Sequence, residues 1–289
     1  MADAAAIAAH LERLLGEPVR HVERVSGGDI CEAWRAELDR GPVFAKSRDD
    51  APDMFRSEAA GLRWLAEPGG APVAQVLAAD EAVLVLEWID VGGRTDEAEE
   101  KLGRGLATVH LAGAPAFGSA PPGGSVSGFV HRLDVDLPPA TSWAEYFVEQ
   151  RLRPLVEEAE RRGALPDGAP ARAERLAGRV GELAGPPEPP ARLHGDLWAG
   201  NVVWGSDDEP WLIDPTAHGG HRETDLGMMR LFGGFGPRTF AAYQEAFPLA
   251  DGWEDRIALH QLQPLLVHAC LFGGGYGGQV DAILRAYTD

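Results

Sequence analysis

Short apolar runs separated by turn residues fill the first part of the chain, a pattern typical of antiparallel strands. Residues 3–15 instead repeat apolar positions at helical spacing, with Ile7, Leu11 and Leu15 on one stripe. Beyond this helix, the pattern predicts a helix at 53–66 and strands at 19–25, 30–38, 42–47, 74–80 and 82–89. We therefore expect a small, mainly antiparallel sheet with one inserted helix.

Longer apolar periodicities follow residue 90, and they predict helices. These lie at 95–112, 141–163, 169–184, 222–232, 237–247, 254–273 and 278–287. A segment rich in Gly, Pro and Ser at 114–140 predicts a long loop, and strand-like runs at 201–205 and 210–215 predict a hairpin. The sequence thus predicts an α+β fold with a sheet-based lobe at 1–90 and a mainly helical lobe at 91–289. Ligands favour the cleft between two such lobes.

Composition and charge restrict the class of partner. A formal net charge of −19 repels nucleic acid and anionic membranes, and no apolar run approaches the roughly 20 residues that cross a bilayer. The N-terminus lacks the basic segment of a secretion signal. Cys31 and Cys270 are too few for a disulfide framework or a cysteine-based zinc site. We expect a cytoplasmic protein that binds neither nucleic acid nor membrane.

Lysine is scarce in this sequence. Lys46 and Lys101 are the only two lysines among 26 basic residues, so arginine serves almost wherever a cation is needed. A compact ammonium is a point charge that a planar guanidinium does not replace. Lys46, at the end of the third expected strand, is therefore a candidate functional cation. The alternative is an ordinary solvated lysine on an edge strand.

The segment HGDLWAGN at 194–201, followed by WLIDP at 211–215, carries the clearest chemical signal. Phosphoryl transfer needs a carboxylate to accept the proton of the attacking hydroxyl, and it needs amide and carboxylate oxygens to hold Mg²⁺ at the nucleotide phosphates. Asp196 fits the first role, and Asn201 and Asp214 fit the second. A polar turn explains any one of these residues but not all three in this order.

This arrangement resembles the protein-kinase-like small-molecule kinases, in which His-Gly-Asp stands where protein kinases have His-Arg-Asp. With IDPTAHGGHRETDLGMMRLFGGF at 213–235 and LFGGGYGG at 271–278, the chain is similar more narrowly to the fructosamine kinase family, which includes ketosamine-3-kinases. The resemblance runs over about residues 1–287. It implies a bilobal protein-kinase-like fold and ATP- and Mg²⁺-dependent phosphorylation of the 3-hydroxyl of ketosamines. Their unstable 3-phosphate then eliminates and frees the amine.

The resemblance also implies a nucleotide site in the first lobe. The residues that it assigns to ATP are Gly27, Gly28, Lys46, Glu58, Glu87 and Ile89. The two glycines lie in VSGGDI, where backbone N–H groups would approach phosphate, although this segment also fits a plain hairpin turn. Lys46 would orient phosphate with Glu58 as its ion-pair partner, and LVLEWID at 84–90 would be the hinge that offers backbone groups to adenine.

Residues around these motifs are candidates for substrate binding and support. Trp198 could stack on the sugar and His268 could hydrogen-bond its hydroxyls, but a core position remains the alternative for each. We expect His194 and Asp225 to support the catalytic loop, and a carboxylate that opens a helix is also stabilised by the helix dipole. His110 is interpreted as a core-packing residue.

Two other functions remain open at this stage. The first is a related kinase of the aminoglycoside or choline type, and the acidic charge would suit cationic aminoglycosides. The second is a catalytically silent nucleotide-binding pseudokinase, which the presence of all four catalytic positions argues against. The expected partner is a small ketosamine or a glycated protein, and the expected state is a monomer or weak homodimer. Some family members carry a redox-sensitive cysteine in the Gly-rich loop, so redox control through Cys31 is a further hypothesis.

Overall fold

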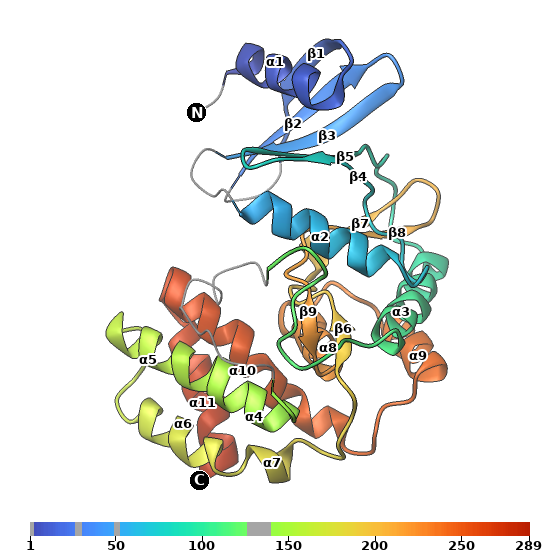
Figure 1. The fold of residues 1–289 in the computed structure, drawn as a ribbon. Coiled ribbons are helices and arrows are strands. Elements are labelled where there is room, and N and C mark those ends of the chain that lie inside the picture. Colours follow the sequence, from blue (N-terminus) through green and yellow to red (C-terminus); the bar gives the residue numbers. More distant parts are fainter. Residues whose placement is uncertain (1–2, 27–30, 49–52, 126–139) are drawn as a thin grey trace.

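The structure of the chain, a computed structural model, describes residues 3–26, 31–48, 53–125 and 140–289 (Figure 1). Its first lobe contains the expected sheet, in the strand order β1-β2-β3-β5-β4 with antiparallel neighbours. The elements are α1 (Ala4–Leu15), β1 (Val19–Arg24), β2 (Glu32–Leu38), β3 (Gly41–Ser47), α2 (Met54–Ala66), β4 (Val76–Ala79) and β5 (Val83–Glu87). Asp3 caps α1 by accepting a hydrogen bond from the N–H of Ala6 at 2.7 Å.

Helices cover both faces of this sheet, with α1 and α2 on opposite sides (Figure 1). Successive side chains of β5 point to opposite faces, as in any strand. Val83 and Val85 belong to the apolar cluster that includes α1, whereas Leu84 and Leu86 belong to the cluster that includes α2. This double burial explains why β5 reads as a continuous apolar run rather than an alternating one.

The second lobe is mainly helical, as expected. Its helices are α3 (Asp96–Leu111), α4 (Trp143–Phe147), a π-helical turn (Val148–Leu152), α5 (Arg153–Arg161), α6 (Ala169–Ala177), α7 (Val180–Leu183), α8 (Glu223–Phe232), α9 (Pro237–Ala246), α10 (Trp253–Phe272) and α11 (Tyr276–Thr288). The helix expected at 169–184 is interrupted between α6 and α7. Within the described residues, no helix combines the length and apolar character that crossing a membrane requires.

Two small antiparallel sheets lie within the second lobe. The expected hairpin consists of β7 (Val202–Trp204) and β8 (Pro210–Leu212), and a second pair joins β6 (Ala191–Leu193) to β9 (His218–Gly220). The β6–β9 pair was not predicted, because three-residue strands are too short to show a period. Together the two pairs flank loop 194–201 and the segment that carries Asp214.

The hairpin β7–β8 also bonds to the first lobe. The N–H of Leu212 donates to the carbonyl of Pro72 at 2.8 Å, and the N–H of Ala74 donates back to Leu212 at 3.2 Å. The N–H of Ser206, between the two strands of the hairpin, donates to the carbonyl of Asp90 at 2.8 Å. One apolar cluster likewise combines residues of α2 and β5 with residues of α3 and α8. The two lobes therefore share a core, and the domain boundary at residue 90 stays a prediction.

Helices α3 and α9 approach each other closely at Gly103. A Cβ added there would lie 2.2 Å from the carbonyl oxygen of Thr239 and 2.8 Å from the backbone nitrogen of Tyr243. Because both neighbours are backbone atoms of α9, they cannot rotate away. This contact fixes the spacing of the two helices.

His218 on β9 is buried with a polar side chain. Its Nδ1–H donates to the carbonyl of Thr216 at 2.8 Å, and its ring lies 6.3 Å from the ring of Tyr146. Burial, together with the charge of Arg151, lowers the pKa of His218 from 6.5 to about 4. The imidazole is therefore neutral in the folded protein at neutral pH.

The close approach of α3 and α9 gives a first prediction. Gly103→Ala should lower the free energy of unfolding by about 2 kcal/mol, because overpacking outweighs the gain in helix propensity. Gly181→Ala in α7 is the matched control, since an added Cβ there meets no atom within 4 Å. That control should be neutral or stabilising by up to about 1 kcal/mol. Urea unfolding of the three proteins tests this, and equal stability of Gly103→Ala and wild type would contradict the packing.

The burial of His218 gives a second prediction, on pH. Between pH 6.5 and about pH 4 the unfolded chain binds a proton at this residue that the folded chain does not, so stability falls as pH falls through this window. Between about pH 7.5 and about pH 5, protonation of His218 in the unfolded chain should lower the free energy of unfolding by about 2 kcal/mol. In urea titrations, His218→Gln should show a correspondingly smaller loss of stability over the same interval. An identical loss in both proteins would contradict the prediction.

Candidate active site

Loop 194–201 connects β6 to β7 and begins with a tightly packed glycine. Gly195 has a φ of +83°, a left-handed conformation that disfavours side chains. A Cβ at this position would also lie 2.3 Å from the carbonyl oxygen of Thr216. Both constraints require glycine, and this conformation places Asp196 directly after the turn.

Asp196 and Asn201 are joined across the loop. The side-chain Nδ2 of Asn201 donates to the backbone carbonyl of Asp196 at 2.7 Å and to its Oδ2 at 3.1 Å. The N–H of Asn201 also donates to the carbonyl of Trp198 at 3.0 Å, which closes a short 3₁₀ turn, Ala199–Asn201. The two residues predicted from the D-x-x-x-x-N spacing are therefore neighbours in space.

The environment of Asp196 makes it a stronger base than an ordinary carboxylate. Burial raises its pKa, and the Asp214 charge acts in the same direction. Electrostatic interactions with His194 and His268 and the hydrogen bond from Asn201 offset this only in part. A carboxylate with a raised pKa accepts a proton more readily.

His194 links the loop to the segment that carries Asp214. It is fully buried, and its Nε2–H donates to the carbonyl of Ile213 at 2.9 Å. Its Nδ1 accepts from the N–H of Asp196 at 3.3 Å. Because a carbonyl can only accept, the proton lies on Nε2 and the lone pair on Nδ1. One imidazole thus ties Asp196 to the residue before Asp214.

Asp214 follows β8 in a left-handed conformation, with a φ of +55°. Aspartate tolerates this region better than most residues, and such positions occur at functional sites. Its Oδ1 accepts a hydrogen bond from the Nζ of Lys46. The carboxylate thereby reaches across the boundary between the lobes.

Lys46 is buried between two carboxylates. Its Nζ donates to Glu58 Oε1 at 2.8 Å, which confirms the expected ion pair with α2, and also to Asp214. Burial alone would lower the pKa of Lys46, but the charges of Glu58 and Asp214 outweigh it and raise the pKa. The ammonium is therefore fully charged at neutral pH. The alternative of a solvated edge-strand lysine is wrong, since Lys46 is 8% exposed.

A buried carboxylate in the first turn of α8 holds the start of loop 194–201. Asp225 Oδ2 accepts from the N–H of His194 at 2.8 Å, and its Oδ1 accepts from the N–H of Gly195 at 2.9 Å. This geometry fits the support role predicted for Asp225. Burial opposes its charge, but hydrogen bonds from His110 and Gly195 and the charges of His110 and His194 lower its pKa.

His110 belongs to the same network, and its interpretation as a packing residue was incomplete. It is buried at the end of α3, where its Nε2 lies 3.1 Å from Asp225 Oδ2 and its Nδ1 lies 2.8 Å from the hydroxyl of Tyr243. These contacts join the α3–α9 interface to the loop. No spacing in the sequence indicates the link, because 115 positions separate His110 from Asp225.

The two candidate substrate residues lie at the surface near the loop. Trp198 is 43% exposed, so it is not a core tryptophan, and its indole lies over Gly200. His268 on α10 is partly buried among aromatic rings, and its Nδ1–H donates to the carbonyl of Pro264 at 2.8 Å. In the neutral ring, its Nε2 is then an acceptor. Substrate binding by either residue stays a prediction.

The other residues predicted to bind the nucleotide lie in the Gly-rich segment and in the connection between the lobes. Gly27 and Gly28 lie outside the described residues, so the expected Gly-rich loop stays a prediction. Glu87 ends β5, and Ile89 lies two positions further along the connection between the lobes. Burial raises the pKa of the Cys31 thiol, which disfavours the reactive thiolate, and its redox role also stays a prediction.

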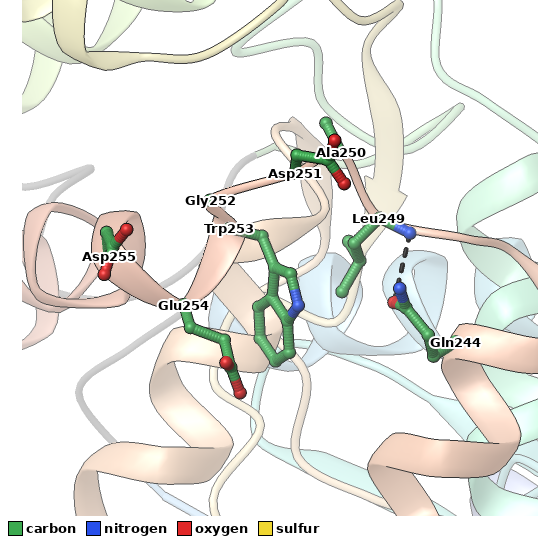
Figure 2. Close-up of a pocket in the computed structure, with 8 residues that line it drawn as sticks. All are labelled: Gln244, Leu249, Ala250, Asp251, Gly252, Trp253, Glu254 and Asp255. Atoms are coloured by element: carbon green, nitrogen blue, oxygen red, sulfur yellow. Dashed lines mark hydrogen bonds between the residues drawn. The ribbon is translucent and has the colours of Figure 1, made fainter.

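A surface pocket on the second lobe is separate from these residues. Figure 2 shows it between the end of α9 and the start of α10. Its lining residues are Gln244, Leu249, Ala250, Asp251, Gly252, Trp253, Glu254 and Asp255. The candidate active site is therefore defined by the chemistry of its side chains, not by this hollow.

Known proteins provide an independent comparison for the fold and the site. The sequence matches the fructosamine kinase family over residues 3–289. It is 34% identical to a probable ketoamine kinase from Synechocystis sp., over 96% of this chain and 95% of that protein. It is 30% identical to ketosamine-3-kinase from Mus musculus, over 95% of this chain and 97% of that protein.

A solved structure agrees with these relatives. The crystal structure of a fructosamine-3-kinase candidate from Thermobifida fusca is 44% identical, covers 99% of both chains and has a TM-score of 0.90. The expected bilobal, protein-kinase-like fold is thereby confirmed. The chain belongs to the fructosamine kinase family and is a phosphotransferase enzyme.

Proposed function

We propose that this enzyme transfers the γ-phosphoryl group of ATP to the 3-hydroxyl of a ketosamine. The observation that carries the proposal is the convergence of Lys46, Asp196, Asn201 and Asp214, which come from both lobes. The mouse relative is named for ketosamine phosphorylation, which supports the choice of acceptor. The 3-phosphate would then eliminate and free the amine, so the reaction would deglycate small amines or proteins. We place this reaction in the cytoplasm.

Asp196 acts as the general base in this proposal. Its carboxylate accepts the proton of the sugar hydroxyl as that oxygen bonds to the γ-phosphorus and the bond to the ADP oxygen breaks. Burial raises its pKa, which favours this proton transfer. Asn201 orients the carboxylate through Nδ2, and His194 and Asp225 hold the backbone beneath it.

The donor atoms at the site fit Mg²⁺, which prefers hard oxygen ligands. Because Nδ2 of Asn201 donates to Asp196, its Oδ1 is left as an acceptor, and Asp214 contributes a carboxylate. Asn201 and Asp214 are thus the residues that would hold the ion. When bound, Mg²⁺ neutralises charge on the nucleotide phosphates.

Lys46 and the connection between the lobes complete the nucleotide site. Lys46, held by Glu58, would position the phosphates, and backbone groups at Glu87 and Ile89 would bind adenine. Gly27 and Gly28 would cover the phosphates. Catalysis would rest mainly on positioning and on neutralising charge.

Removal of the base gives a third prediction. Asp196→Asn should lower kcat by about 10²–10⁴-fold, because the amide cannot accept the proton, while nucleotide affinity stays close to that of wild type. Asp39→Asn is the control, since Asp39 is an exposed carboxylate paired with exposed Arg20. The control should keep wild-type kcat.

Steady-state kinetics and nucleotide calorimetry on the two variants make the comparison. Wild-type turnover by Asp196→Asn would refute the assignment of the base. Loss of nucleotide binding together with turnover would assign Asp196 to the nucleotide site instead.

The identity of the acceptor gives a fourth prediction. In an ADP-release assay, the ribulosamine, erythrulosamine or fructosamine of one amine should be phosphorylated with kcat/KM at least about 100-fold above aminoglycosides, a difference of about 2.7 kcal/mol. Phosphorus NMR of the product should place the phosphate on the 3-oxygen. Preference for an aminoglycoside would replace the proposed acceptor, and ATP binding without turnover of any acceptor would support a pseudokinase.

A further inference from the structure

Exposed apolar side chains gather beside the candidate active site. Among the described residues, the exposed large apolar side chains are Val91, Leu111, Trp198, Phe232, Leu271 and Phe272. Trp198 lies in loop 194–201, Phe232 ends α8, and Leu271 and Phe272 end α10. Four of the six thus belong to the loop or to the helix ends near it. Exposed apolar residues that form a contiguous patch, unlike scattered ones, mark binding sites.

The rings of this region form one connected cluster, which we call the ring cluster and define as Phe232, His268, Phe272 and Tyr276. The ring of His268 lies at its centre, 5.0 Å from Phe232, 5.5 Å from Phe272 and 5.1 Å from Tyr276. Phe272 and Tyr276 are 6.5 Å apart. These distances are those of interacting aromatic pairs, so the rings support one another while Phe272 stays 65% exposed.

The ring cluster lies close to the loop that carries the proposed base. Phe232, a member of the cluster, ends α8 two positions before Gly234. The segment that follows Phe232 packs on loop 194–201, because a Cβ added at Gly234 would lie 2.4 Å from the Cβ of Ala199. The ring cluster and loop 194–201 are therefore neighbours.

The space beside the rings is open. Gly273, Gly274 and Gly275 connect α10 to α11 directly after Phe272. A Cβ added at any of the three meets no atom within 4 Å. Three residues without side chains thus leave room for a ligand next to Phe272 and Tyr276.

We propose that the ring cluster is the subsite for the amine end of the substrate, and that it selects ketosamines formed from small apolar amines. This inference rests on the proposed function. The rings of the cluster offer an apolar surface to an apolar substituent. The secondary ammonium of a ketosamine would lie over an aromatic face, where cation–π attraction and the acidic net charge both favour it.

The expected preference for an apolar amine can be calculated from the apolar area that one benzyl ring buries. Burying about 50 Å² of a benzyl group against Phe232 and Phe272 favours binding by about tenfold at about 25 cal/mol per Å². A hydroxyethyl substituent gains little from the same contact. The ratio of the two dissociation constants therefore measures the subsite.

The test is calorimetric binding of two ketosamines that share one sugar, one carrying benzylamine and one carrying ethanolamine, in the presence of Mg²⁺ and ADP. Wild type should bind the benzyl ketosamine about tenfold more tightly. The double variant Phe232→Ser/Phe272→Ser should reduce this ratio to about twofold or less, whereas Phe272→Leu, which keeps apolar area, should preserve most of it. Leu111→Ser is the control, because Leu111 is 57% exposed but lies on α3, outside the ring cluster.

Each outcome decides the inference. An unchanged ratio in the double variant, or equal affinity of wild type for the two ketosamines, overturns the subsite. If either result is found although the ADP-release assay shows phosphate transfer to these ketosamines, the proposed function holds without the subsite. The expected ratios without phosphate transfer support the subsite and overturn the proposed reaction. No binding of either ketosamine overturns both.

Discussion

The carboxylate of Asp225 determines where loop 194–201 can lie, because it accepts hydrogen bonds from two consecutive backbone N–H groups of that loop. Those two bonds fix the backbone turn at Gly195, and this turn determines the position of Asp196. The same carboxylate contacts His110, so a helix of the second lobe, the loop and α8 share one buried charge. A buried carboxylate that lacks a hydrogen-bond partner costs free energy. Alternative positions of the loop that leave Asp225 unpaired are therefore disfavoured.

Periodicity and motif order predicted most of the fold and part of the site. The sheet, the inserted helix and the helical lobe follow from apolar spacing, and the pair Lys46–Glu58 follows from the resemblance to kinases. The strands β6 and β9 were missed because three buried residues carry no alternation. His110 was missed because its partner is far away in the sequence and a buried histidine has no distinctive pattern. Tertiary contacts, not local propensity, decide both cases.

The charged residues of the segment GHRETDL, at 220–226, form buried ion pairs that stabilise the second lobe. Arg222 pairs with Glu188 at 2.6 Å, although 34 positions separate them. Glu223 receives two hydrogen bonds from Arg256, and although burial opposes its charge, these bonds and His260 lower its pKa to about 2. Both buried carboxylates of this segment, Glu223 and Asp225, therefore have cationic or N–H partners. Almost all of the excess negative charge of the chain is carried by other residues.

The bonds between hairpin β7–β8 and the first lobe have a mechanical consequence. Leu212 exchanges backbone hydrogen bonds with Pro72 and Ala74 of the first lobe, and the N–H of Ser206 donates to the carbonyl of Asp90. Separation of the lobes at this hairpin would break these bonds and expose the shared apolar cluster. The hairpin that lies between loop 194–201 and the Asp214 segment therefore also ties the two lobes together.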